Sequence, residues 1–198
     1  MYKVAVIGGG VLGTSIAYFL SGQAKDPSSI ALIEKERDIA RHTSSRNTGK
    51  VHAPFLYDPV KKRTLAKAAF LGYEMWGRYA KEKRLPFVRD GVLEVALDDK
   101  GIERLQKYLT WGEANGLERH ELRFLDKKQV AEMEPSVRCE SAIYCSKDGS
   151  VDYGAFSRAL LQDLRSFGCS VLLGHKVTRI SRKIGYTIST DLGEIQAE

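Results

Sequence analysis

Residues 4–20 of the chain read VAVIGGGVLGTSIAYFL, and they indicate how the fold begins. Four apolar residues, Val4–Ile7, predict a short buried strand. The glycines that follow lead into a run of small and apolar residues that predicts a helix. A second apolar run, Ile30–Ile33, predicts another strand and ends at Glu34. Strand, helix and strand in this order are typical of a parallel βαβ unit.

The glycines at positions 8, 10 and 13 have the spacing of a dinucleotide-binding loop. Gly8 permits the tight turn, Gly10 lets the backbone approach a pyrophosphate, and Gly13 lets the helix pack closely on the strand. The free N–H groups at the start of the helix then bind the phosphates. Glu34, at the end of the second strand, is suited to accept hydrogen bonds from ribose hydroxyls. The pattern therefore predicts binding of an ADP-containing dinucleotide, either FAD or NAD.

The order of the later segments favours FAD. An NAD-dependent dehydrogenase would continue with alternating strands and helices, whereas here a loop rich in Ser, Thr, Asn and Arg follows Glu34. A helix–strand unit resumes only after GSVDY at 149–153. We therefore expect an α/β fold. Its Rossmann-like, three-layer FAD-binding domain would be formed by residues 1–80 and 148–198, and residues 81–147 would interrupt it as part of a mixed α+β substrate domain.

Cap residues and apolar periodicity predict the remaining helices. Asp58 as N-cap and Pro59 as first helical residue indicate a helix that stops near Pro86. Asp98 and Asp152 are N-cap candidates for two further helices. The other expected features are a strand or hairpin over 87–97, a helix end at Gly168, a strand over 170–173 and a hairpin over 177–191 that turns at Ile184-Gly185.

The composition is that of a globular protein, with 43% hydrophobic residues, 28% charged residues and a formal net charge of +6. The charges are interspersed and no recognition module accompanies them, so we expect no nucleic-acid partner. No apolar run reaches the length of a transmembrane segment and no signal peptide precedes the first strand. We therefore expect a cytoplasmic location, with peripheral contact to a membrane as an open alternative. Three cysteines without CxxC spacing and four histidines without an HExxH motif indicate reduced thiols and no metal site.

Four stretches carry a family resemblance: VAVIGGGVLGTSIAYFL, IEKE, HTSSRNTGKVHA and GSVDYGAFSRALLQDLRSFGCSVLLGHKVTRI. Through them the chain resembles the FAD-dependent D-amino-acid-oxidase-like superfamily. It is most similar to the branch that contains L-2-hydroxyglutarate dehydrogenases or oxidases and FAD-dependent glycerol-3-phosphate dehydrogenases. The resemblance implies that FAD is the cofactor. The cofactor-binding positions that it implies are Gly8, Gly10, Val11, Leu12, Gly13, Glu34, Lys35, Ser44, Ser45, Asn47, Thr48 and Val177.

Two further residues are implied to face the reaction. His52 matches a histidine near the flavin and is the candidate catalytic base, although Pro54 stands where that branch has glycine. Tyr57 matches a tyrosine directed toward the substrate. Leu56 occupies the position of an arginine in the glycerol-phosphate branch, which removes a phosphate ligand and argues against glycerol 3-phosphate. The other interpretations are a structural histidine, a tyrosine that caps the next helix, and a plain surface turn over Ser44–Thr48.

The resemblance implies a flavoprotein oxidoreductase, a dehydrogenase that oxidises a small 2-hydroxy acid, a carboxylate substrate, by hydride transfer to the flavin. Members of the superfamily are longer than this chain. The chain is therefore expected to be the N-terminal half of such an enzyme, completed by a C-terminal half or a second chain. Three alternatives stay open: an FAD-dependent amine or amino-acid oxidase or dehydrogenase, a non-catalytic nucleotide-binding subunit, and an NAD-dependent dehydrogenase.

Overall fold

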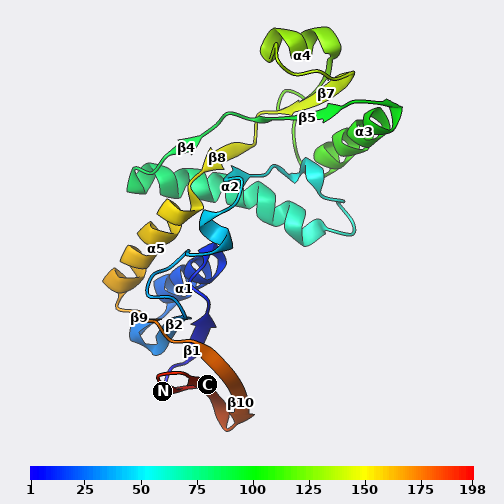
Figure 1. The fold of residues 1–198 in the computed structure, drawn as a ribbon. Helices are drawn as coiled ribbons and strands as arrows, with labels where there is room; N and C mark the ends of the chain where they lie inside the picture. The colour runs from blue at the N-terminus through cyan, green and yellow to red at the C-terminus, as the bar shows by residue number, and fades with distance from the viewer. The chain divides into compact units, whose positions relative to one another are not determined.

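A computed structural model describes residues 1–198, and its chain divides into two compact units (Figure 1). The first unit contains residues 1–48 and 152–198, and the second contains residues 49–151. The first unit is thus discontinuous in sequence. Its boundaries differ from those expected at 80 and 148, because the long helix α2 (Arg63–Lys83) belongs entirely to the second unit.

The first unit is built on a parallel sheet of three strands. These are β1 (Val4–Ile7), β2 (Ile30–Glu34) and β9 (Ser170–Leu173), in the order β1-β2-β9. Every residue of β2 is buried, because both faces of the central strand are covered. Helices α1 (Val11–Gln23) and α5 (Tyr153–Phe167) lie side by side on one face. The core on this face consists of Val6, Ala17, Ile30, Leu32, Leu164 and Cys169.

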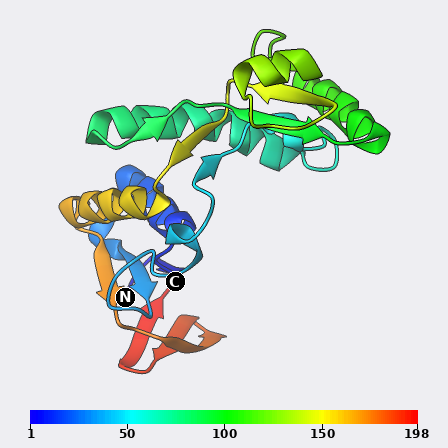
Figure 2. The same cartoon turned by 45° about the horizontal axis from the view of Figure 1, so that its top comes forward.

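An antiparallel meander covers the other face of this sheet. It comprises β10 (Val177–Lys183), β11 (Gly185–Thr190) and β12 (Gly193–Ala197), and it packs through Ile188 and Ala197 onto the central strand. The two chain ends lie close together beside this meander (Figure 2), where Tyr2 pairs with Ala197. Helices, parallel sheet and meander form three layers, which confirms the predicted α/β class, and the hairpin turn at Gly185 is as expected.

Local signals explain the ends of α5. The Asp152 side chain accepts the N–H of Ala155 at 3.0 Å, and Gly168 ends the helix with a φ of 86°. The left-handed conformation at Gly168 is one that a glycine adopts without a steric penalty. Both the predicted cap and the predicted stop are therefore confirmed.

The second unit contains two small antiparallel sheets. The first has the order β5-β7-β6, formed by β5 (Val92–Ala96), β7 (Ser141–Cys145) and β6 (Leu122–Asp126). Helix α3 (Asp99–Ala114) packs on it around the buried Phe55 and Leu105, and α4 (Lys127–Met133) packs on it through Val130. The second sheet has the order β3-β8-β4 and consists of β3 (Lys50–Val51), β8 (Gly149–Val151) and β4 (Phe87–Val88).

One prediction for the second unit was wrong in detail. Helix α2 begins at Arg63, because the Asp58 side chain accepts the N–H groups of Val60 and Lys61, at 2.9 Å each, and closes a separate turn. Of the two alternatives predicted for residues 87–97, a strand or a hairpin, the structure has strands and no hairpin. The two strands pair with different partners, β4 with β8 and β5 with β7.

Candidate functional site

The glycine loop between β1 and α1 turns at the carboxyl end of the parallel sheet. Gly8 has a φ of +110°, and its N–H donates to the carbonyl of Ile33 at 2.8 Å. A β-carbon on Gly13 would lie 1.8 Å from the carbonyl oxygen of Gly8. No side chain fits at position 13, so its glycine allows the first turn of α1 to lie directly on the loop.

The start of α1 faces the polar loop that follows β2. The hydroxyl of Ser44 accepts the N–H of Val11 at 2.9 Å, and a β-carbon on Gly10 would lie 2.8 Å from the same hydroxyl. Gly10 caps the helix without a side-chain hydrogen bond, and no acidic residue occupies the first turn. The first N–H groups of a helix lack intrahelical partners and carry partial positive charge. This end of α1 is therefore suited to bind an anion such as a pyrophosphate.

Glu34 lies at the end of β2 and is only 8% exposed. One of its carboxylate oxygens accepts the N–H of Gly9, and the other accepts the N–H of Glu36 at 2.9 Å. The carboxylate thus holds the glycine loop in place, a role that the sequence pattern does not indicate. Because two carboxylate oxygens provide about four acceptor positions, Glu34 retains capacity for further hydrogen bonds such as those from a ribose.

The remaining predicted contacts lie in the same unit. Lys35 is exposed, and Ser45, Asn47 and Thr48 are exposed residues of the polar loop. The side-chain amide of Asn47 donates to the carbonyls of two earlier loop residues at 3.0 and 3.2 Å, so it shapes the loop. Leu12 projects outward from the first turn of α1 and is 78% exposed.

Val177 begins β10, directly after a segment that crosses the end of β2. Within that segment the N–H of Gly174 donates to the carbonyl of Glu36, and the N–H of His175 donates to the carbonyl of Glu34, each at 2.9 Å. Predicted contacts to pyrophosphate, ribose and adenine therefore meet along the carboxyl edge of one parallel sheet. Ligands bind at this edge in open α/β sheets.

The second unit holds the predicted base, His52, immediately after β3. Its Nδ1 atom lies 3.3 Å from a carboxylate oxygen of Asp148, which also accepts the N–H of Ala53 at 3.1 Å. The hydrogen bond that His52 donates to Asp148 raises the pKa of His52, partial burial opposes that shift, and the negative charge of Asp148 adds to the increase. Asp148 was not among the predicted site residues. The antiparallel pairing of β3 with β8 identifies it, because this register brings Asp148 beside His52.

Tyr57 follows a short 3₁₀ helix, Pro54–Leu56, in the second unit. The side-chain amide of Asn115 donates to the backbone carbonyl of Tyr57 at 2.8 Å and to that of Pro54 at 3.0 Å. Leu56 packs against the core around Phe55. The backbone carbonyl of Tyr57 is therefore held by Asn115, the C-cap residue of α3, and Tyr57 does not act as the N-cap of α2, whose N-cap residue is Lys62.

No helix of the chain combines the length and the apolar character that crossing a bilayer requires.

The three cysteines are free and buried, and burial raises the pKa of Cys145 to about 12. A thiol in that state is not an effective nucleophile at neutral pH.

Comparison with known proteins places this geometry in context. A glycerol 3-phosphate dehydrogenase from Caloramator mitchellensis is 34% identical over 194 residues, which cover 96% of this chain and 39% of that protein. A mitochondrial L-2-hydroxyglutarate dehydrogenase from Caenorhabditis elegans is 29% identical over 201 residues, which cover 100% of this chain and 45% of that protein. The chain thus spans less than half the length of either relative.

A solved structure gives the same picture of the fold. A dithionite-reduced L-alpha-glycerophosphate oxidase from Mycoplasma pneumoniae, with FAD bound, is similar with a TM-score of 0.85 and 26% identity, over 96% of this chain and 49% of that one. The family model described as FAD dependent oxidoreductase matches residues 3–198. Because that match covers nearly the whole sequence, this chain belongs to the FAD dependent oxidoreductase family.

Proposed function

We propose that the first unit binds the ADP part of FAD along the carboxyl edge of its parallel sheet. The observation that carries this proposal is the start of α1. Gly10 has no side chain there to cover the backbone, and the Ser44 hydroxyl lies beside the N–H of Val11. A pyrophosphate fits a helix N-terminus that has no acidic residue in its first turn. The family membership supports FAD as the dinucleotide.

Each predicted residue has a role in this proposal. The N–H groups of Leu12 and Gly13 bind the pyrophosphate beside Val11, whose own N–H donates to Ser44, and Glu34 uses its remaining acceptor positions for the ribose hydroxyls. Val177 contacts the adenine through its backbone. The exposed residues assigned to the phosphates and the flavin are Lys35, Ser45, Asn47 and Thr48.

We further propose that the longer protein, or the complex that contains this chain, oxidises a small 2-hydroxy acid. Bound FAD would accept the hydride from the substrate carbon. His52 accepts the hydroxyl proton, and Tyr57 contacts the substrate. Leu56 supports a carboxylate over a phosphate substrate, because it is an apolar residue packed against the core.

The proposal includes a partner and a location. The relatives extend over more than twice the matched length, so a C-terminal half, on the same polypeptide or on a second one, completes the substrate site. Free cysteines are typical of reducing compartments, which supports the cytoplasm.

Anaerobic reduction of the bound flavin tests the proposed activity. The chain would be co-purified with its completing half and mixed in turn with 2-hydroxyglutarate, glycerol 3-phosphate and glycine. We expect the flavin absorbance to bleach with the 2-hydroxy acid and much more slowly in a His52→Gln variant. Bleaching by glycine instead would favour an amine oxidase. Bound FAD that no substrate reduces would favour a non-catalytic nucleotide-binding subunit.

A further inference from the structure

The pairing of β3 with β8 brings His52 and Asp148 together. In this antiparallel pair Lys50 is opposite Ser150 and Val51 is opposite Gly149. Continuing the register by one residue places His52 opposite Asp148, and the observed contact of 3.3 Å between Nδ1 and Oδ2 agrees with it. The register of a strand pair is strongly specified where one face is buried, because a slip by one residue would move every side chain to the opposite face of the sheet. The contact is thus set by the sheet.

The two partners differ sharply in exposure. The side chain of Asp148 is 0% exposed, whereas that of His52 is 41% exposed. The Oδ2 atom of Asp148 accepts the N–H of Ala53 as well as contacting the histidine, while its Oδ1 atom is buried with no hydrogen-bond partner. Removing a carboxylate from water without full hydrogen bonding is costly. An apolar residue or an asparagine would fill this position at a smaller cost, so a purely structural role explains the aspartate poorly.

We propose that Asp148 is a positioning residue that holds the neutral His52 ring with its proton on Nδ1 and its free acceptor on Nε2. A carboxylate has no proton to donate, so the histidine must be the donor in their hydrogen bond. Neutral imidazole carries only one N–H, which leaves the lone pair of Nε2 exposed. This inference rests on the proposed function, in which His52 receives the substrate proton.

The proton and electron balance of the step is then complete. The substrate hydroxyl gives its proton to Nε2 of His52, and bound FAD would be the two-electron oxidant that takes the hydride of the substrate carbon as the alcohol becomes a carbonyl. The resulting imidazolium has N–H groups on both nitrogens, and Asp148 stabilises its charge through Nδ1. A buried aspartate orients the general-base histidine of the Ser-His-Asp triad in the same way.

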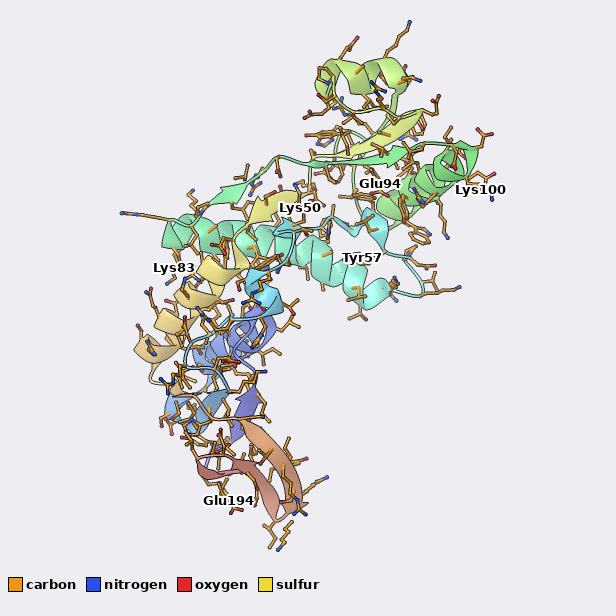
Figure 3. All side chains as sticks on the ribbon, in the orientation of Figure 1. Lys50, Tyr57, Lys83, Glu94, Lys100 and Glu194 are labelled. Atoms are coloured by element: carbon orange, nitrogen blue, oxygen red, sulfur yellow. The ribbon has the colours of Figure 1, made fainter.

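Other charged groups act on the ring more weakly. Lys50 opposes protonation of His52 and Glu94 favours it, and both residues belong to the same unit (Figure 3). Lys50 is itself paired with Asp90 at 3.1 Å. The contact of Nδ1 with the buried carboxylate of Asp148 is the one that selects the tautomer.

Nitrogen-15 NMR of the histidine rings tests this inference in the chain as it is. At a pH where His52 is neutral, we expect its proton on Nδ1, with the assignment made by comparison with His52→Gln. In Asp148→Asn, the amide oxygen can still accept the N–H of Ala53, while the amide N–H₂ can donate to Nδ1. We therefore expect the proton to move to Nε2 and the titration midpoint to fall.

The chain supplies a matched control. His120 also contacts a carboxylate through Nδ1, at 3.2 Å from Glu118, but both side chains are largely exposed. In Glu118→Gln we expect little change in the nitrogen-15 spectrum of His120, because water replaces an exposed partner. If the spectra of His52 and His120 changed to a similar extent when their carboxylate partners were replaced, the buried Asp148 would have no special role.

The outcomes separate this inference from the proposed function. A proton on Nε2 in the wild-type chain would overturn the inference even if Asp148→Asn failed to fold. An unchanged tautomer and midpoint in a folded Asp148→Asn variant would overturn it as well. The NMR readout needs no FAD, so a chain that keeps the Nδ1 proton but binds no FAD would contradict the proposed function alone.

Discussion

The hydroxyl of Ser44 accepts the backbone N–H of Val11 at 2.9 Å, although 33 residues separate them in sequence. This contact joins the polar loop after β2 to the start of α1. It places a hydroxyl at the end of the helix where a phosphate would bind. The loop and the helix start therefore form one local structure, built from two distant parts of the sequence.

Replacing Ser44 tests that contact. We expect Ser44→Ala to lower the free energy of unfolding by about 0.5–1.5 kcal/mol, because the N–H of Val11 loses its acceptor. The affinity for FAD should fall by up to about tenfold. Ser45→Ala is the matched control for stability, because that hydroxyl is exposed and makes only a 3.3 Å contact with the carbonyl of His42. Urea unfolding of both variants measures the difference in stability, and equal losses would show that the contact with Val11 contributes nothing; FAD titration of Ser44→Ala measures the affinity.

The close contact between Gly13 and Gly8 leads to a prediction about stability. A β-carbon at position 13 would lie 1.8 Å from the Gly8 carbonyl oxygen, so the helix must shift to accommodate it. We expect Gly13→Ala to cost about 1–3 kcal/mol of unfolding free energy.

Gly22 is the control for this substitution. It lies in the same helix, and a β-carbon there would have no neighbour within 4 Å. Gly22→Ala should therefore be neutral or stabilising by up to about 1 kcal/mol. Thermal or urea unfolding without ligand compares the two, and a Gly13→Ala variant as stable as wild type would mean that the loop does not lie against the helix as described.

Glu34 should matter for folding before any ligand binds. Its carboxylate accepts the N–H groups of Gly9 and Glu36. Glu34→Ala would leave the buried N–H of Gly9 without an acceptor, which costs about 1–3 kcal/mol. Glu36→Ala is the control, because that side chain is partly exposed and pairs with His42. Unfolding in the absence of FAD should separate the two variants. Equal free energies of unfolding would mean that Glu34 does not stabilise the glycine loop and acts only on the ligand.

The first unit could largely be predicted from the sequence, because its signals are local. The strand Val4–Ile7, the glycine spacing and the cap at Asp152 each depend on neighbouring residues. The double role of Glu34 could not be predicted, because the N–H that it accepts belongs to a residue 25 positions away. A carboxylate at the end of a strand has the same sequence signal whether it binds backbone or ribose.

The second unit was harder to predict, for a physical reason. Strands β4 and β5 flank Asp90-Gly91, which is a typical hairpin signal, yet they pair with β8 and β7. These partners lie far along the chain, and no local pattern identifies them. Asp148 was missed for the same reason, since its contact with His52 spans 96 residues. The sequence at Asp58 and Pro59 is compatible with the start of a helix and with an isolated turn. The structure has the turn, and α2 begins only at Arg63.

The hydrogen bond with Asp148 makes the contribution of His52 to stability depend on pH. Its pKa is raised in the folded chain, so protonated His52 stabilises the fold. This stabilisation is fully present below the pKa of the unfolded chain and is lost as the pH rises through the higher folded value. We expect the difference in unfolding free energy between wild type and His52→Gln to shrink from mildly acidic to mildly basic pH. Urea unfolding across that range measures it, and a difference that is constant or grows with pH would contradict the contact.

A titration of the chain with FAD tests whether the glycine loop binds the ADP part of FAD. Wild type and Gly10→Val would be titrated by flavin fluorescence, with ADP as competitor and Gly22→Val as a control for a valine in the same helix. We predict saturable binding to wild type and Gly22→Val, competition by ADP, and no binding to Gly10→Val, where the side chain would overlap the Ser44 hydroxyl. Equal FAD binding by wild type and Gly10→Val, or no competition by ADP, would contradict the account.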